Sequence, residues 1–152
     1  MDQIDNLLVR ILAENSDVTA TELMSRVNLS VPAINKRIAR LKSSGVIRAS
    51  SVLTDPKKVG KPIIAFVMVV LDQFANAESL MQYVRSDPDV LECYAVTGEY
   101  DYLLKICAAD VNAFEDKLLH LKRSRGVVKS HSLLSLKEEK FAPSALPDVQ
   151  PG

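Results

Sequence analysis

A chain of 152 residues that is 47% hydrophobic and 25% charged has the composition of an ordinary globular protein and excludes a disordered one. No apolar run approaches the ~20 residues of a membrane-spanning helix, and Met-Asp-Gln-Ile-Asp has neither the basic nor the apolar part of a signal peptide. We therefore expect a cytoplasmic protein without a membrane partner.

The formal net charge of zero conceals an uneven distribution of charge along the chain. Residues 1–61 hold ten Lys or Arg against six Asp or Glu, whereas residues 62–152 hold nine against thirteen. Between residues 23 and 54 there are six basic residues and no carboxylate. Solvated protein surfaces usually mix charges of both signs, so this window predicts an anionic partner.

Three helices are expected in the first 48 residues. Apolar residues spaced at i, i+3, i+4, i+7 and i+8 over residues 4–12 predict the first. The segment Thr19-Ala20-Thr21-Glu22 has the pattern of a capping box and predicts a second helix up to about Val27. After a tight turn, Ser30 suits the N-cap of a third helix, and Gly45 suits its C-terminal end.

Two helices joined by a turn of about three residues form a helix-turn-helix, whose second helix enters the DNA major groove. The carboxylate-free window covers this second helix, and it favours DNA binding over a plain three-helix core with a basic surface. We expect bases to be read near the start of the helix and phosphates to be contacted farther along it. The expected base-reading residues are Ser30, Pro32, Ala33 and Asn35, and the expected phosphate contacts are Lys36, Arg37 and Arg40.

The second half of the chain has the element order βαββαβ, which is the ferredoxin-like arrangement. A short strand and a linker are expected before it, at residues 49–61, and a tail after it, at residues 139–152. The first strand is almost continuously apolar and β-branched, as in a strand buried on both faces. The expected elements are a strand at Ile63–Leu71, a helix capped by Asn76, strands at Val90–Val96 and Tyr102–Ala108, a helix capped by Asp110 or Asn112, and a strand at Val127–Leu136.

The two cysteines lie in the strands of the predicted hairpin. With residues 98–101 as its loop, Cys93 lies opposite Ile106 and Cys107 lies opposite Glu92. The two sulfur atoms then fall on opposite faces of the sheet, out of register for a disulfide. We expect buried free thiols.

The hairpin loop, Thr97-Gly98-Glu99-Tyr100-Asp101-Tyr102, has more polar groups than a turn requires. Gly98 permits the close approach of a ligand whose carboxylate meets free backbone amides, and Asp101 suits an ammonium group. An amino acid carries both charges on one carbon. The residues by themselves favour the simpler interpretation that Asp101 is a turn residue bonded to its own backbone.

Catalysis and metal binding have little support in the residues. His120 and His131 fall in different predicted elements, and no Cys-x-x-Cys, Gly-x-Ser-x-Gly or P-loop motif is present. We therefore expect neither an enzyme nor a metal site. Two alternatives to a DNA-binding protein that senses an amino acid remain open. They are a DNA-architectural protein without an effector and a winged-helix module that binds protein.

Residues 29–47, Leu-Ser-Val-Pro-Ala-Ile-Asn-Lys-Arg-Ile-Ala-Arg-Leu-Lys-Ser-Ser-Gly-Val-Ile, resemble the recognition-helix signature of the Lrp/AsnC family of bacterial and archaeal regulators. The opening Asp-x-x-Asp, the Gly-x-x-Asp of the hairpin loop, and Ser-Ala-Leu-Pro at 144–147 are also similar, the last to leucine-responsive members. The chain departs from the family at Lys42, where glutamate is frequent, and at Ala49-Ser50, which replaces a glycine-aromatic pair. The resemblance covers about residues 2–147.

This resemblance implies an α+β protein with a winged-helix-like DNA-binding domain at 1–48 and a ferredoxin-like sensing and assembly domain at 62–138. It implies a transcriptional regulator without a cofactor, whose DNA binding or assembly responds to an amino acid such as leucine or methionine. Dimers would form through the sheets and assemble further into octamers. The implied effector-binding residues are Thr97, Gly98, Glu99, Tyr100, Asp101 and Tyr102, with Ser132 and Leu134 contributed by a neighbouring protomer.

Overall fold

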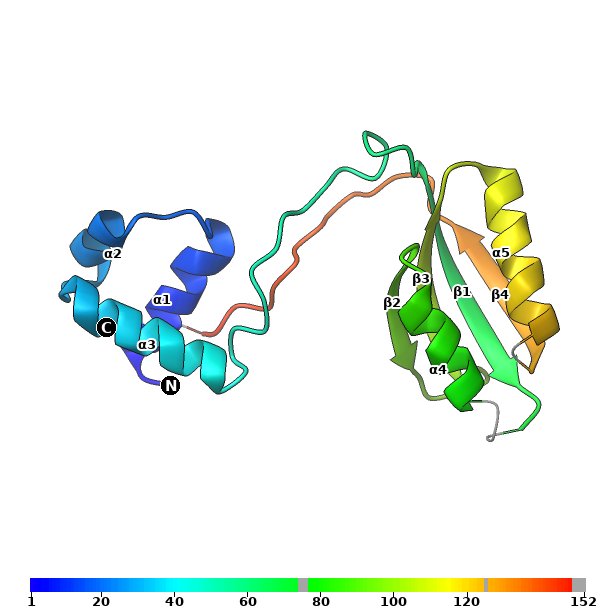
Figure 1. Ribbon diagram of the computed structural model, residues 1–152, viewed down its shortest axis with the longest axis horizontal. Coiled ribbons are helices and arrows are strands. Elements are labelled where there is room, and N and C mark those ends of the chain that lie inside the picture. The colour runs from blue at the N-terminus through cyan, green and yellow to red at the C-terminus, as the bar shows by residue number, and fades with distance from the viewer. Residues whose placement is uncertain (74–76, 125, 149–152) are drawn as a thin grey trace. The chain divides into compact units, whose positions relative to one another are not determined.

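The computed structural model describes residues 1–73, 77–124 and 126–148 (Figure 1). The chain divides into two compact units. The first, here called the helical unit, comprises Met1–Val52 and Lys140–Gly152, and the second, the sheet unit, comprises Leu53–Glu139. Residues 140–148 therefore belong to the helical unit, where the carbonyl oxygens of Pro147 and Asp148 accept hydrogen bonds from the side chains of Arg10 and Asn6 at 3.1 Å.

The helical unit contains the three predicted helices, α1 (Gln3–Glu14), α2 (Ala20–Val27) and α3 (Val31–Ser43). The capping box at the start of α2 is confirmed, because the Thr19 hydroxyl accepts from the Glu22 amide while the Glu22 carboxylate accepts from the Thr19 amide. Ser30 is the N-cap of α3, but its side chain makes no capping hydrogen bond. The core of the unit consists of Leu8, Ile11, Leu23, Val27, Ile34 and Leu41.

The strand predicted within residues 49–61 is wrong for this structure. These residues contain no strand, and the part from Asp55 to Lys61 folds into turns in which Lys58 and Val59 donate to the Asp55 carbonyl. An extended segment becomes a strand only where a neighbouring segment completes its ladder of hydrogen bonds. No described part of the chain does so for residues 49–54.

The sheet unit has the predicted βαββαβ order and forms one antiparallel sheet with the strand order β2-β3-β1-β4 (Figure 1). Asp110 accepts a hydrogen bond from the Ala113 amide at 2.8 Å and so caps α5, as predicted. The predicted cap of α4, Asn76, lies outside the described residues. The elements are β1 (Ile63–Leu71), α4 (Ala77–Ser86), β2 (Val90–Ala95), β3 (Tyr102–Ala108), α5 (Val111–Ser124) and β4 (Val127–Leu134).

Both helices pack on the same face of the sheet. Val67 of β1 is fully buried in one cluster with Leu80 of α4 and Leu121 of α5. Because side chains alternate along a strand, Phe66 points to the other face, where it is 36% exposed. The prediction that β1 is buried on both faces is therefore wrong for the single chain. We call the uncovered side the open face of the sheet; its residues include Phe66, Met68, Tyr94, Leu103, His131 and Leu133.

The predicted hairpin register is wrong by two residues. Ala95 pairs with Tyr102, so that Cys93 lies opposite Leu104, and Cys107 pairs with Ile64 of β1. The shift arises because the loop begins at Val96, whose amide donates to the Asp101 carbonyl at 3.0 Å. The thiols remain free and on opposite faces, and burial raises the pKa of both.

Candidate functional site

The first two turns of α3 present the residues that the sequence predicts as base contacts. Ser30, Pro32 and Asn35 are exposed, and Ala33 is partly exposed. Asn35 and the next residue, Lys36, are exposed on the helix and make no side-chain hydrogen bond or ion pair among the described residues. This end of α3 is thus available to a ligand along the face predicted for DNA.

Arg37 and Arg40 have a different environment from Lys36. Nη1 of Arg37 lies 2.6 Å from an oxygen of Asp2 and 2.8 Å from Oδ1 of Asp5, and Nη2 of Arg40 lies 2.7 Å from Oδ2 of Asp5. Their side chains are 24% and 61% exposed, respectively. The structure therefore places two of the three predicted phosphate contacts in ion pairs with the start of α1.

The ionisation of this cluster follows from its contacts. Burial is the largest influence on Asp5 and opposes its ionisation, but hydrogen bonds from Arg37 and from the Asp2 amide hold its pKa below the ordinary value. The hydrogen bond from Arg37 likewise lowers the pKa of Asp2, and Asp2 and Asp5 raise the pKa of Arg37. Both carboxylates and the Arg37 guanidinium are consequently charged at neutral pH.

The hairpin loop is attached to the end of β1. The Asp101 amide donates to the Val69 carbonyl, and the Asp101 Oδ2 atom accepts from the Leu71 amide, both at 2.9 Å. The simpler interpretation expected the Asp101 carboxylate to bond to the backbone of its own loop. Instead it bonds to the backbone of β1. Its other oxygen, Oδ1, accepts no hydrogen bond from the described residues.

Gly98 lies at the tip of the loop with a φ of +107°, a conformation that side chains disfavour. A Cβ atom added there would meet nothing within 4 Å, so the backbone conformation and not internal packing requires the glycine. The neighbouring tip residues Thr97 and Glu99 are exposed. The tip is thus accessible to a molecule outside the chain.

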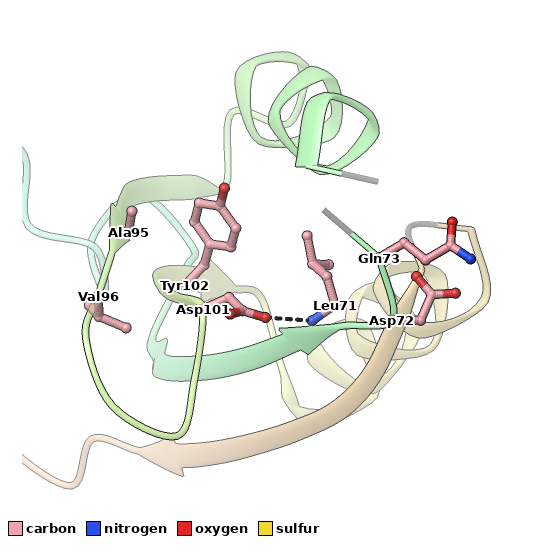
Figure 2. A pocket seen from close by; sticks show the side chains of 7 residues that line it. All are labelled: Leu71, Asp72, Gln73, Ala95, Val96, Asp101 and Tyr102. Atoms are coloured by element: carbon pink, nitrogen blue, oxygen red, sulfur yellow. Dashed lines mark hydrogen bonds between the residues drawn. The ribbon is translucent and has the colours of Figure 1, made fainter. Parts of the chain in front are cut away.

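A hollow of about 310 Å³ lies beside Asp101, where β1 and β2 end and β3 begins. Figure 2 shows the side chains of Asp72 and Gln73 at one end of this hollow and those of Ala95 and Val96 at the other, with Asp101 and Tyr102 between them. Leu71 adds an apolar side chain to the lining. The hollow therefore combines apolar walls with a carboxylate that has one oxygen open.

Tyr100 points to a different part of the sheet. Its ring lies 5.0 Å from Nζ of Lys129, close enough for a cation–π contact, and its centroid lies 6.4 Å from that of His131. Lys129 and His131 pair with Val70 and Met68, so this contact lies on the open face. Tyr100 and Tyr102 are consequently directed to separate surroundings.

Ser132 and Leu134 do not join the loop within one chain. They pair with Val67 and Ala65 of β1, whereas the loop is bonded to Val69 and Leu71. At the usual rise of a strand, Ala65 and Leu71 are about 20 Å apart. Any contact of Leu134 with a ligand in the hollow would require a second protomer.

Five lining residues were not predicted: Leu71, Asp72, Gln73, Ala95 and Val96. The sequence does contain a signal for the first three, because the polar pair Asp72-Gln73 directly follows the apolar run of β1. Neighbouring antiparallel strands bring the end of one beside the start of the next. The residues after β1 and β2 were therefore candidates for the surroundings of the loop.

The two histidines lie in separate elements, as predicted. His120 of α5 lies beside Tyr83, with ring centroids 5.5 Å apart, whereas His131 is in β4. Within residues 1–73, 77–124 and 126–148, no three or more His, Cys, Asp or Glu side chains are grouped to hold a metal ion. The same residues include no helix long and apolar enough to cross a membrane.

Two family models match the chain, a winged helix-turn-helix DNA-binding model at residues 1–48 and an Lrp/AsnC ligand-binding domain model at residues 64–145. The HTH-type transcriptional regulator LrpA of Mycobacterium tuberculosis is 36% identical over 84% of this chain and 85% of its own length. The two models and this relative describe a transcriptional regulator and not an enzyme.

Solved structures that resemble the chain over nearly its whole length include two complexes with L-methionine. A transcriptional regulator from Neisseria meningitidis, in complex with L-methionine, is 35% identical with a TM-score of 0.90, covering 95% of this chain and 96% of that one. The feast or famine regulatory protein of M. tuberculosis, complexed with L-methionine, is 32% identical with a TM-score of 0.89, covering 96% and 99%.

Proposed function

Because the chain belongs to the Lrp/AsnC family of transcriptional regulators, we propose that it binds specific DNA through α3 and that an amino acid changes its DNA binding or assembly. One observation carries the proposal. The chain contains both features that such a regulator needs. The first turns of α3 are exposed and lie in a stretch without carboxylates, and a hollow lies beside Asp101, which has one carboxylate oxygen without a partner among the described residues. The first feature suits DNA, and the second suits a small cation with an apolar part.

The effector is an amino acid with an apolar side chain, such as leucine or methionine. The open oxygen of Asp101 receives the ammonium group, and the amides near Gly98 and Glu99 receive the carboxylate. The side chain lies against Leu71, Ala95 and Val96, the apolar part of the hollow. The two L-methionine complexes among the similar structures support this class of ligand.

Dimers form through the open face of the sheet and assemble further into octamers. Phe66, Tyr94 and Leu133 on this face are 36%, 54% and 50% exposed, and contiguous apolar area of this kind is characteristic of protein contacts. Assembly also brings Ser132 and Leu134 of one protomer to the effector loop of another. In a dimer, two copies of α3 read half-sites ~34 Å apart in a roughly palindromic operator.

Calorimetric titration with each of the twenty amino acids, followed by DNA binding with and without any that binds, tests the proposal. We expect at least one apolar amino acid to bind and to change DNA affinity or oligomeric state. Sequence-independent compaction of DNA with no response to any amino acid would instead establish the architectural alternative. An absence of DNA binding at every salt concentration would contradict both.

A further inference from the structure

Asp5 of α1 is the one charged residue that is buried among the described residues, with 2% of its surface exposed. Each of its carboxylate oxygens accepts a hydrogen bond from a different arginine of α3, Oδ1 from Arg37 and Oδ2 from Arg40. These arginines are three positions apart and therefore lie on the same side of α3. A single carboxylate thus holds α3 at two points about one helical turn apart.

The basic residues of α3 and its surroundings consequently fall into two groups. Of the six between residues 23 and 54, two are matched by the carboxylates of Asp2 and Asp5. The other four form no ion pair with any described residue; they are Arg26, Lys36, Lys42 and Arg48. Lys36 is the only one of the four in the middle of α3.

We propose that Asp5 is a positioning residue for DNA recognition, which holds Arg37 and Arg40 away from the phosphates and leaves Lys36 as the phosphate contact of mid-α3. The proposal rests on the proposed function, in which α3 faces DNA. It replaces the prediction that Arg37 and Arg40 contact phosphates directly. Arg37 contacts both carboxylates with 24% of its side chain exposed, whereas Arg40 contacts Asp5 alone with 61% exposed.

Specificity is the expected benefit of this arrangement. Phosphate contacts attract every DNA sequence equally, whereas base contacts require the start of the helix to have a defined orientation. Pairing the two arginines with Asp5 limits the attraction to phosphates of any sequence. It also fixes the orientation of α3 that the base contacts require. Arg40 borders an open hollow of about 490 Å³, so it has room to leave Asp5 if that charge is removed.

The test is the salt dependence of DNA binding for four proteins: the wild type, Asp5→Asn, Arg37→Gln and Lys36→Gln. Each lost phosphate contact flattens the plot of log affinity against log salt by about one unit. We expect Lys36→Gln to do so and Arg37→Gln to leave the slope unchanged. Asp5→Asn should steepen the slope by about one to two units, because it releases the arginines.

Asp5→Asn should also reduce the ratio of specific to non-specific affinity, which a purely structural role would not change in a protein that remains folded. A second variant, Asp2→Asn, keeps a good N-cap for α1 and releases only one contact of Arg37, so it serves if Asp5→Asn does not fold. Asp2→Asn should steepen the slope by less than about one unit.

Equal flattening by Arg37→Gln and Lys36→Gln would overturn the proposal, since Arg37 would then contact phosphate. An unchanged slope and specificity ratio in folded Asp5→Asn would also overturn it. An unchanged slope in Lys36→Gln would overturn it as well, because Lys36 is the phosphate contact that the proposal names. A different result points to the proposed function: if the wild type binds DNA without salt dependence, α3 does not face DNA.

Discussion

Asp5 in the helical unit and Asp101 in the sheet unit are the same residue type in two different environments. Asp5 is buried and accepts hydrogen bonds from two arginines, one on each oxygen. Asp101 is exposed and borders a hollow; among the described residues its carboxylate accepts one hydrogen bond, from the Leu71 amide to Oδ2, and none on Oδ1. A carboxylate whose oxygens are both satisfied within the chain positions other residues, whereas one with an open oxygen beside a cavity is suited to a ligand.

The largest expected effects come from the cores that support these two aspartates. The two core clusters share no residue. Leu8 and Leu104 are fully buried, and replacing either of them with alanine should lower the free energy of unfolding by about 2–5 kcal/mol. Urea unfolding monitored by amide hydrogen exchange measures this. Leu8→Ala should reduce the protection of amides in the helical unit, and Leu104→Ala should reduce it in the sheet unit. Equal loosening of both units by either variant would show that they fold as one.

Removing the charge of Asp101 tests its use as a ligand contact. Asparagine can still accept from the Leu71 amide but cannot pair with an ammonium group, so Asp101→Asn should keep the fold. A lost hydrogen bond to a charged group corresponds to about ten- to a hundred-fold weaker amino-acid binding. Calorimetry measures this, and Asp101→Ala is the comparison that should lose stability as well. Unchanged affinity in Asp101→Asn would leave this residue a purely structural role.

Asn35→Ala tests whether the exposed start of α3 reads bases. Asparagine pairs bidentately with adenine, and such a pair discriminates by about 1–3 kcal/mol. We expect the variant to lose affinity for its best operator while its affinity for random DNA stays within about two-fold. Competition binding with both DNAs measures the difference. An equal loss on both would make Asn35 a backbone contact.

The smallest expected effect is the loss of stability of the helical unit in acid. The pKa of folded Asp5 is below the ordinary value, so its contribution to stability is complete above the ordinary carboxyl pKa of about 4 and is lost as the pH falls through the lowered value. Thermal unfolding between about pH 5 and about pH 2.5 should therefore show a shallower decline for the helical unit of Asp5→Asn than for the wild type. Parallel declines would show that Asp5 does not carry this pH dependence.

Sequence patterns by themselves determined the elements of both units. The three helices, the capping box at Thr19 and the βαββαβ order follow from periodicity and from residues within about four positions of each other. The loop around Gly98 was recognisable for the same reason, since its residues are consecutive. Interactions of this range are set by local backbone geometry, which is why neighbouring residues suffice to predict them.

Only the tertiary structure decided what the charged residues contact. Arg37 meets Asp2 and Asp5 more than thirty positions away, and Asp101 meets the Leu71 amide thirty positions away. The hairpin register and the missing strand at 49–61 were mispredicted for a related reason, because pairing depends on a partner segment that no local pattern identifies. An ion pair forms where packing brings two side chains together, and the packing of α1 on α3 or of a loop on β1 is a property of the whole folded unit.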